Sequence, residues 1–176
     1  MKVSNLLIVA GTGNKSGKTT FACRLIEQFK SLGIISIKIT PHFHETTAGL
    51  KLIKENTEYS IYEETDPESS KDTSRMLKAG AVRVYFAKVN DNSLFEAFKN
   101  ILDLIPSGAP VVCESPALRY KVDPGLFIIM MSAEKDNQKD INKLLSLPHV
   151  ELNMTFLSGC KKLPVDFKNG KWESLS

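Results

Sequence analysis

The stretch Ala10-Gly11-Thr12-Gly13-Asn14-Lys15-Ser16-Gly17-Lys18-Thr19-Thr20 stands between two segments of different pattern, and it decides the fold class. Residues 6–10, Leu-Leu-Ile-Val-Ala, form a short continuous apolar run, which is typical of a strand buried on both faces. Residues 18–32 carry apolar side chains at helical spacing, and Gly33 is a natural helix stop. A glycine-rich turn between a buried strand and a helix is the context of a phosphate-binding loop, or P-loop.

Each residue type in this stretch suits a polyphosphate. Glycines let the backbone turn tightly and approach phosphate oxygens, and the start of a helix points unpaired N–H groups at an anion. Lys18 can reach the β- and γ-phosphates, and the Thr19 hydroxyl can ligate Mg²⁺. We therefore expect ATP or GTP with Mg²⁺ to be held by Gly11, Thr12, Gly13, Asn14, Lys15, Ser16, Gly17, Lys18, Thr19 and Thr20.

The loop departs from the usual pattern at one position. The pattern has glycine five residues before Gly17, where this chain has Thr12, although glycines flank it on both sides. Lys15 is not the extra lysine of the deviant loops that dimerise around nucleotide, because that lysine would fall at Gly13. We interpret Lys15 as a solvated residue or an additional phosphate contact.

The remainder of the chain alternates between strand and helix patterns. Ile35, Ile37 and Ile39 alternate with polar residues and predict a half-exposed strand. We expect further strands at 82–87, 111–113, 126–131 and 154–158, and helices near 70–79, 92–105 and 137–147, the first capped by Ser69 or Ser70. This alternation predicts an α/β fold of the P-loop NTPase class, with a mostly parallel sheet, helices on both faces and a single domain spanning 1–176.

Residues 41–69 are polar, lack a sustained period and form an insertion in this pattern. Segments 50–53 and 59–62 could pair as a hairpin around Asn56. A connection of this length is usually functional or disordered. We expect a mobile arm over the nucleotide site that becomes ordered on binding a ligand or partner. The alternative is a hairpin packed permanently on its own domain or across a homodimer interface.

Composition limits the partners. The chain has 176 residues, a net charge of +3, and scattered Lys and Arg residues, so nucleic acid is not indicated as a partner. The apolar run at 6–10 is too short for a signal peptide or membrane span, and we expect a cytoplasmic protein without a membrane partner. The three cysteines form no CxxC pair, which argues against a disulfide framework or zinc site.

Four polar residues outside the loop are candidates for the site. Glu114 ends the apolar run 111–113 and could hold Mg²⁺ together with Thr19 or orient water, whereas the alternative is a solvated glutamate. Asp72 falls in the first turn of a predicted helix, where the helix dipole alone favours a carboxylate. His42 and His44 could contact phosphate, substrate or metal, but two histidines without a third ligand make a poor metal site.

The segment Lys71-Asp72-Thr73-Ser74-Arg75-Met76-Leu77-Lys78-Ala79-Gly80-Ala81 closely resembles the Lys-Asp-Ser-Tyr-x-x-Arg-Lys-Ala-Gly-Ala stretch of the MobB family. The Gly-Lys-Thr-Thr at 17–20, the Lys-x-Thr-x-His at 38–42 and the Cys-Glu-Ser at 113–115 are similar to that family's motifs in the same order. The family has glycine where this chain has Ser115, and the likeness ends near Met131.

The resemblance implies a GTP-binding partner protein in the synthesis of molybdopterin guanine dinucleotide. It favours slow hydrolysis of GTP or ATP, with Lys18, Glu114 and Asp72 as the catalytic groups. Gly11-Thr12 through Gly17-Lys18-Thr19 also resembles dethiobiotin synthetase, which implies an ATP-dependent kinase or ligase acting on a small metabolite. An adaptor that binds nucleotide without hydrolysing it, together with a protein partner, is the third alternative.

Overall fold

The structure is a computed structural model that describes residues 1–13, 15–42, 46–133 and 141–175. Its strands are β1 (Lys2–Gly11), β2 (Ile35–Thr40), β3 (Leu50–Glu55), β4 (Tyr59–Glu64), β5 (Arg83–Val89), β6 (Val111–Glu114), β7 (Asp123–Met131), β8 (Val150–Asn153), β9 (Val165–Lys168) and β10 (Lys171–Ser174). Its α-helices are α1 (Lys18–Gln28), α2 (Asp72–Lys78), α3 (Leu94–Leu102), α4 (Asn142–Leu145) and α5 (Met154–Gly159). Short 3-10 helices lie at Lys30–Leu32, Asp91–Ser93 and Ala117–Tyr120.

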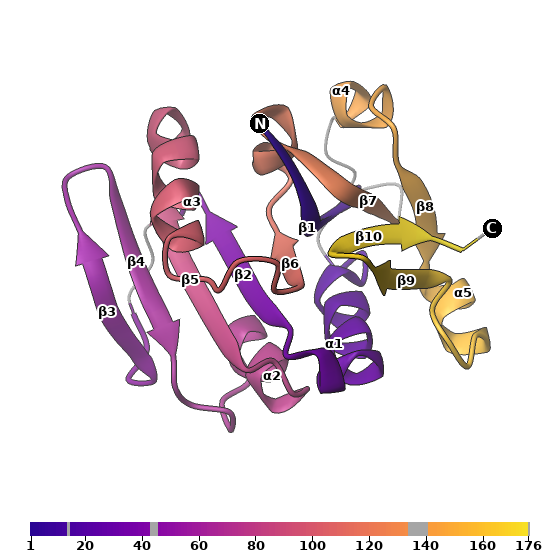
Figure 1. Cartoon of the computed structure of the whole chain (residues 1–176), viewed down its shortest axis with the longest axis horizontal. Helices are drawn as coiled ribbons and strands as arrows, with labels where there is room; N and C mark the ends of the chain where they lie inside the picture. The colour runs from indigo at the N-terminus through magenta and orange to yellow at the C-terminus, as the bar shows by residue number, and fades with distance from the viewer. Residues whose placement is uncertain (14, 43–45, 134–140, 176) are drawn as a thin grey trace.

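Eight of the described strands form one sheet in the order β3-β4-β5-β2-β6-β1-β7-β8 (Figure 1). The six strands β5, β2, β6, β1, β7 and β8 run parallel to one another. β4 pairs antiparallel with both β5 and β3. The hairpin β3–β4 lies at one end of the sheet, and β8 with α5 lies at the other (Figure 1). The carboxyl ends of the parallel strands therefore share one edge of the sheet.

Consecutive residues of a strand point to opposite faces of the sheet. The central strands carry apolar side chains on both faces, and helices cover each of them. Leu7 and Val9 of β1 join an apolar cluster with Phe21 of α1 and Met76 of α2. Leu6 and Ile8 join a second cluster that includes residues of α3 and α4. The four β1 side chains named here are fully buried. The predicted α/β architecture, with a mostly parallel sheet flanked by helices, is confirmed.

The prediction of a half-exposed second strand is wrong. Ser36 of β2 is fully buried, and Lys38 and Thr40 are half-buried, because helices cover both sides of this central strand. The predicted cap of α2 is also wrong. The position before Asp72 is taken by Lys71, which makes no side-chain cap hydrogen bond, and Ser69 accepts a hydrogen bond from the Lys71 N–H at 3.3 Å instead.

The strand predicted at 154–158 is a helix. Asn153 ends β8, and its side chain accepts a hydrogen bond of 2.8 Å from the N–H of Phe156, so that α5 begins at Met154. The last strand of the sheet is consequently β8, four residues earlier than predicted. The predicted helix at 137–147 is described only from residue 141 onward, where α4 forms.

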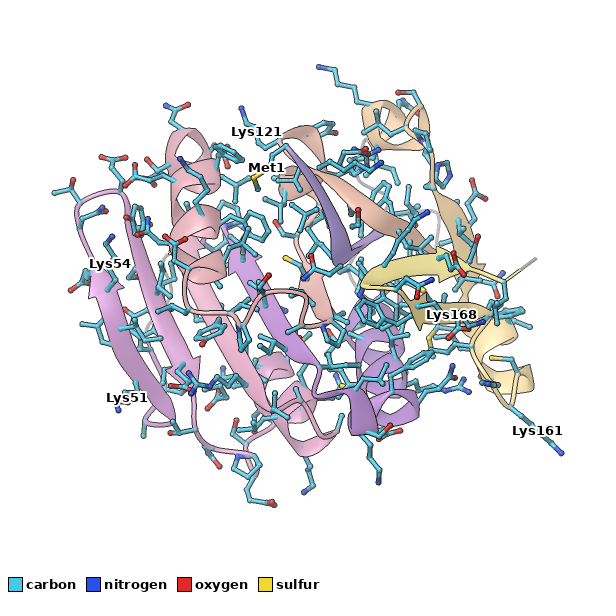
Figure 2. All side chains as sticks on the ribbon, viewed as in Figure 1. Met1, Lys51, Lys54, Lys121, Lys161 and Lys168 are labelled. Carbon is cyan, nitrogen blue, oxygen red and sulfur yellow. The ribbon has the colours of Figure 1, made fainter. Side chains whose placement is uncertain are left out.

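The predicted hairpin at 50–62 is confirmed, but it is not an arm standing apart from the fold. β4 is hydrogen-bonded on both sides, and Tyr59 and Ile61 are each only 1% exposed. β3 forms the edge of the sheet, from which Lys51 and Lys54 project outward (Figure 2). Lysines on an exposed edge strand discourage pairing with another chain.

The C-terminal hairpin of β9 and β10 packs beside the main sheet and was not predicted. Trp172 of β10 is fully buried, and its indole N–H donates to the carbonyl of Val111 at 3.2 Å. Asn169 and Gly170 connect the two strands with positive φ angles of 52° and 71°. Of the helices that the structure describes, none is long and apolar enough to cross a membrane.

Candidate functional site

A cleft opens where the carboxyl ends of three parallel strands meet the start of α1. Lys38 of β2 and Val9 of β1 are both in register with Glu114 at the end of β6, so the ends of these strands lie side by side. The cleft has a volume of about 490 Å³, within the usual range for small-molecule sites. It is lined by Lys15, Ser16, Gly17, Lys18, Thr19, Thr20, Lys38, Asp72, Arg75, Glu114 and Met154.

Two glycines of the loop between β1 and α1 have a steric reason to be glycine. A Cβ on Gly11 would lie 2.1 Å from Oγ of Ser16 and 2.9 Å from Cγ of Lys18. Gly17 has φ of +94°, and its added Cβ would lie 2.4 Å from Sδ of Met154. Both positions therefore let the loop fold tightly against α1 and α5.

Thr12, which replaces the usual glycine, ties this loop to the end of β7. Its backbone N–H donates to the carbonyl of Met130 at 3.1 Å, and its hydroxyl accepts from the N–H of Ser132 at 2.7 Å. The residue is only 4% exposed. The threonine therefore anchors the first part of the loop on the neighbouring strand and does not line the cleft.

The ammonium of Lys18 lies over the loop. It donates to the carbonyl of Gly13 at 3.0 Å and to Oγ of the buried Ser16 at 3.3 Å. Lys15 is exposed and holds a left-handed conformation with φ of 57°. Asn14, a predicted phosphate contact, lies outside the described residues.

The helix that follows the loop begins without a carboxylate. The first turn of α1 contains no acidic residue. Its N-cap residue is Gly17, which makes no side-chain cap hydrogen bond. The first N–H groups of a helix lack helical partners and carry partial positive charge. Together with Lys18, this turn therefore presents positive potential to the cleft.

Thr19 and Glu114, which both line the cleft, are in contact. The Thr19 hydroxyl donates to Oε2 of Glu114 at 2.9 Å, although the residues are 95 positions apart. Glu114 is only 6% exposed, as a strand-end residue enclosed by neighbouring strands would be. The two residues predicted as metal ligands are thus in direct contact.

Charged side chains continue from Glu114 toward α2. The Lys38 ammonium lies 3.3 Å from Oε1 of Glu114 and also forms an ion pair with Oδ2 of Asp72. On the far side, Arg75 approaches Oδ1 of Asp72 at 3.6 Å. The structure thus brings the predicted residues Asp72 and Glu114 together through a lysine that lies between them.

The pKa values of this cluster reflect the pairing. Burial alone would lower the pKa of Lys38, but Glu114 and Asp72 outweigh it and raise the pKa above its ordinary value. Burial would raise the pKa of Asp72, but the hydrogen bond and charge of Lys38, aided by Arg75, bring it below its ordinary value. Both groups therefore stay charged near neutral pH.

Lys38, Arg75 and Met154 line the cleft but were not predicted as site residues. Lys38 lies near the end of β2, and the pairing of β2 with β6, which ends in Glu114, brings it into the site. Arg75 follows Asp72 by one helical turn. Met154 was not predicted as a site residue because a strand, and not the helix α5, was predicted at 154–158.

Neither of the candidate histidines is among the described residues that line the cleft. His42 is exposed and does not line the cleft, and its backbone N–H donates to the Thr40 hydroxyl at 3.2 Å. His44 lies outside the described residues. Arg119 is nearly buried elsewhere, next to the carbonyl of Val122 and the carboxylate of Asp123.

The chain matches none of the protein-family models, curated proteins or solved structures with which it was compared.

Proposed function

We propose that this protein binds a nucleoside triphosphate, ATP or GTP, together with Mg²⁺, and hydrolyses it slowly. The observation that carries the proposal is the contact between Thr19 and Glu114, beside Lys18, in a cleft at the carboxyl edge of the sheet. Ligands of open α/β sheets bind at this edge. On this proposal the β1–α1 loop is a phosphate-binding loop and the fold is of the P-loop NTPase type.

The phosphates would lie against the loop and the first turn of α1. Gly11 and Gly17 allow close approach of the backbone, and the unpaired N–H groups of α1 favour an anion. Lys18 would exchange its present acceptors, the Gly13 carbonyl and the Ser16 hydroxyl, for phosphate oxygens. Phosphate oxygens carry negative charge, whereas the Gly13 carbonyl and the Ser16 hydroxyl are neutral acceptors, so the attraction between opposite charges favours that exchange.

The residues present fit a magnesium ion. Mg²⁺ favours oxygen ligands and is usually held by one or two carboxylates, water and substrate phosphates. The Thr19 hydroxyl and a Glu114 oxygen, 2.9 Å apart, would supply the protein's share of such a set. When bound, the ion neutralises charge on the phosphates.

Hydrolysis would need little covalent chemistry from the chain, because phosphoryl transfer depends on positioning and charge stabilisation. Lys18 would stabilise charge on the phosphates, and Glu114 or Asp72 could accept a hydrogen bond from the attacking water. Arg75 lines the cleft but is engaged by Asp72 at 3.6 Å. A site whose arginine is held by its own carboxylate is consistent with slow turnover.

We also propose which nucleobase is bound and in which pathway the protein acts. The resemblance to the MobB family supports GTP and a protein partner in molybdenum-cofactor synthesis. A kinase or ligase would need a pocket for its second substrate, and the insertion at 41–69 is a candidate for forming it, yet no described residue of that segment lines the cleft. We therefore favour hydrolysis or stoichiometric binding over transfer to a small metabolite.

Calorimetric titration with ATP and with GTP, each with and without Mg²⁺, tests the proposal. We expect saturable binding that Mg²⁺ strengthens and slow release of phosphate. Lys78→Ala removes an exposed lysine from α2 and should bind nucleotide as wild type does, which checks that loss of one surface charge does not change the affinity. The proposal is wrong if neither nucleotide binds at millimolar concentration. Binding without phosphate release would retain the nucleotide site and reject hydrolysis.

A further inference from the structure

Lys38 takes up the oxygen of Glu114 that Thr19 leaves open. Thr19 donates to Oε2 at 2.9 Å, and the Lys38 ammonium lies 3.3 Å from Oε1. Asp72 binds the same ammonium from the other side. A positive charge therefore already lies between the two carboxylates that would attract a metal ion into this cleft.

We propose that Lys38 is an internal cation that keeps divalent metal ions away from Glu114 until a polyphosphate enters the cleft. The proposal rests on the proposed function, because it concerns the order in which metal and nucleotide reach the same site. It makes Lys38 a positioning residue that acts through Glu114, and it predicts that metal enters together with nucleotide.

The charge balance of the cleft supports this role. Among the described side chains that line it, Lys15, Lys18, Lys38 and Arg75 are positive, whereas Asp72 and Glu114 are negative. A bare divalent cation therefore meets a net positive charge in a confined space, where like charges repel strongly. A triphosphate reverses the sign of the cleft, and metal and nucleotide then attract each other.

Burial explains why Lys38 stays in place in the absence of another anion. Its side chain is 21% exposed, and the side chain of Glu114 is 7% exposed. Leaving either partner of such an enclosed pair without a counter-charge is unfavourable. Release of Lys38 from Glu114 thus requires a new partner, and phosphate oxygens in the same cleft can provide it.

An ion pair that only stabilises the fold would affect unfolding but not metal affinity, and direct metal binding separates the two roles. The probe is Mn²⁺ alone, which takes the same oxygen ligands and whose free concentration is measured by electron paramagnetic resonance. The variants are Lys38→Met, Lys38→Arg and the double variant Lys38→Met with Glu114→Gln. Lys78→Met, which breaks the exposed ion pair with Glu68 at 3.0 Å, is the matched control.

We expect Lys38→Met to bind Mn²⁺ without nucleotide on the order of tenfold or more tightly than wild type, because a like charge at contact distance has been removed. Lys38→Arg and Lys78→Met should bind as wild type does, and the double variant should lose the gain. Lys38→Gln, which keeps donors for both carboxylates, replaces Lys38→Met if the latter does not fold.

Equal Mn²⁺ affinity in wild type and the folded neutral variant overturns the role of Lys38. The same holds if the double variant keeps the gain, because the metal would then lie away from Glu114. Nucleotide titration of the wild type is run in parallel. Failure to bind ATP or GTP would reject the proposed function, whereas a gain in Mn²⁺ affinity would still support metal exclusion by Lys38.

Discussion

Thr19 at the start of α1 donates a 2.9 Å hydrogen bond to Glu114 at the end of β6, and this contact joins the loop to the centre of the sheet. Neither residue could take this position alone. The start of α1 places the hydroxyl in the cleft, and the register of β1 with β6 brings the carboxylate at the end of β6 next to it. Their meeting point is where hydroxyl and carboxylate oxygens can share one cation.

Thr19→Ala and Glu114→Gln should therefore weaken the effect of Mg²⁺ more than they weaken binding of nucleotide without metal. Thr19→Ala removes the hydroxyl ligand and Glu114→Gln removes the negative charge of the carboxylate, while both variants leave Lys18 and the loop backbone in place. Titration of ATP or GTP with and without Mg²⁺ measures the ratio of the two affinities. If that ratio equals the wild-type ratio in both variants, the metal is held elsewhere.

Lys18→Ala should abolish triphosphate binding and leave the fold intact. Lys18 donates to the Gly13 carbonyl and to Ser16, and loss of two charged hydrogen bonds to phosphate, at about 1.5–3 kcal/mol for each bond, should lower affinity by more than about 100-fold and leave no binding that calorimetry detects. Calorimetry measures the affinity, and circular dichroism checks the fold. Lys78→Ala is the control. Undiminished affinity in folded Lys18→Ala would contradict the assignment of this loop.

Gly11→Ala should weaken nucleotide binding although it adds only a methyl group. The new Cβ would lie 2.1 Å from Oγ of Ser16 and 2.9 Å from Cγ of Lys18, so both side chains must move. We expect a loss of affinity of roughly tenfold or more, in keeping with the cost of displacing positioned groups. Gly159→Ala is the matched control, because its Cβ would meet nothing within 4 Å. Equal affinities in the two variants would refute the steric argument.

The stability contributed by Asp72 should be lost in acid. The partners of Asp72 lower its pKa from an ordinary value of 3.8, so its contribution is complete above about pH 5 and disappears as pH falls through 3.8 and below. Because the Asp72 side chain is 37% exposed, we expect Asp72→Asn to cost only about 1 kcal/mol at pH 7.

Urea unfolding from pH 3 to 7 compares wild type with Asp72→Asn. The difference in the free energy of unfolding should shrink as the pH is lowered. Glu68→Gln, which removes the partner of Lys78 from an exposed ion pair, is the control and should differ little from wild type. A difference for Asp72→Asn that stays constant across this range would show that its ionisation is not linked to folding.

Much of this architecture could be predicted from the sequence because local patterns and the fold agree. The apolar run at 6–10, the glycine-rich loop and the helical spacing after it predicted β1 and α1, and Glu114 was placed because it ends an apolar run. The segment 154–158 misled because Thr155 and Phe156 favour strands, whereas the capping hydrogen bond of Asn153 starts a helix there.

Other features depended on long-range pairing that no local pattern specifies. Lys38 joins the site only because β2 and β6 are neighbours, although they are separated by three other strands in the sequence. The hairpin β9–β10 did carry a local signal, since Asn169-Gly170 is the preferred pair for a tight hairpin turn. Its place beside the sheet depends on Trp172, whose burial the sequence could not show.

The pairing of β4 predicts strong protection of its amides from hydrogen exchange even without nucleotide. β4 lies between β3 and β5, Ile61 is only 1% exposed, and the Tyr59 hydroxyl donates to Glu96 of α3 at 3.0 Å. Amides of strands bonded on both sides open only with large parts of the fold, whereas those of the edge strand β3, whose residues 51–55 are exposed, open locally.

Exchange of residues 46–65 followed by mass spectrometry, with and without Mg²⁺ and nucleotide, measures both strands. We expect slow exchange in β4 and faster exchange in β3, with little change in β4 when nucleotide is added. Peptides from β1 serve as the internal reference, because that central strand is buried on both faces. Rapid exchange of β4 that slows only on addition of nucleotide would instead favour an arm that becomes ordered on binding.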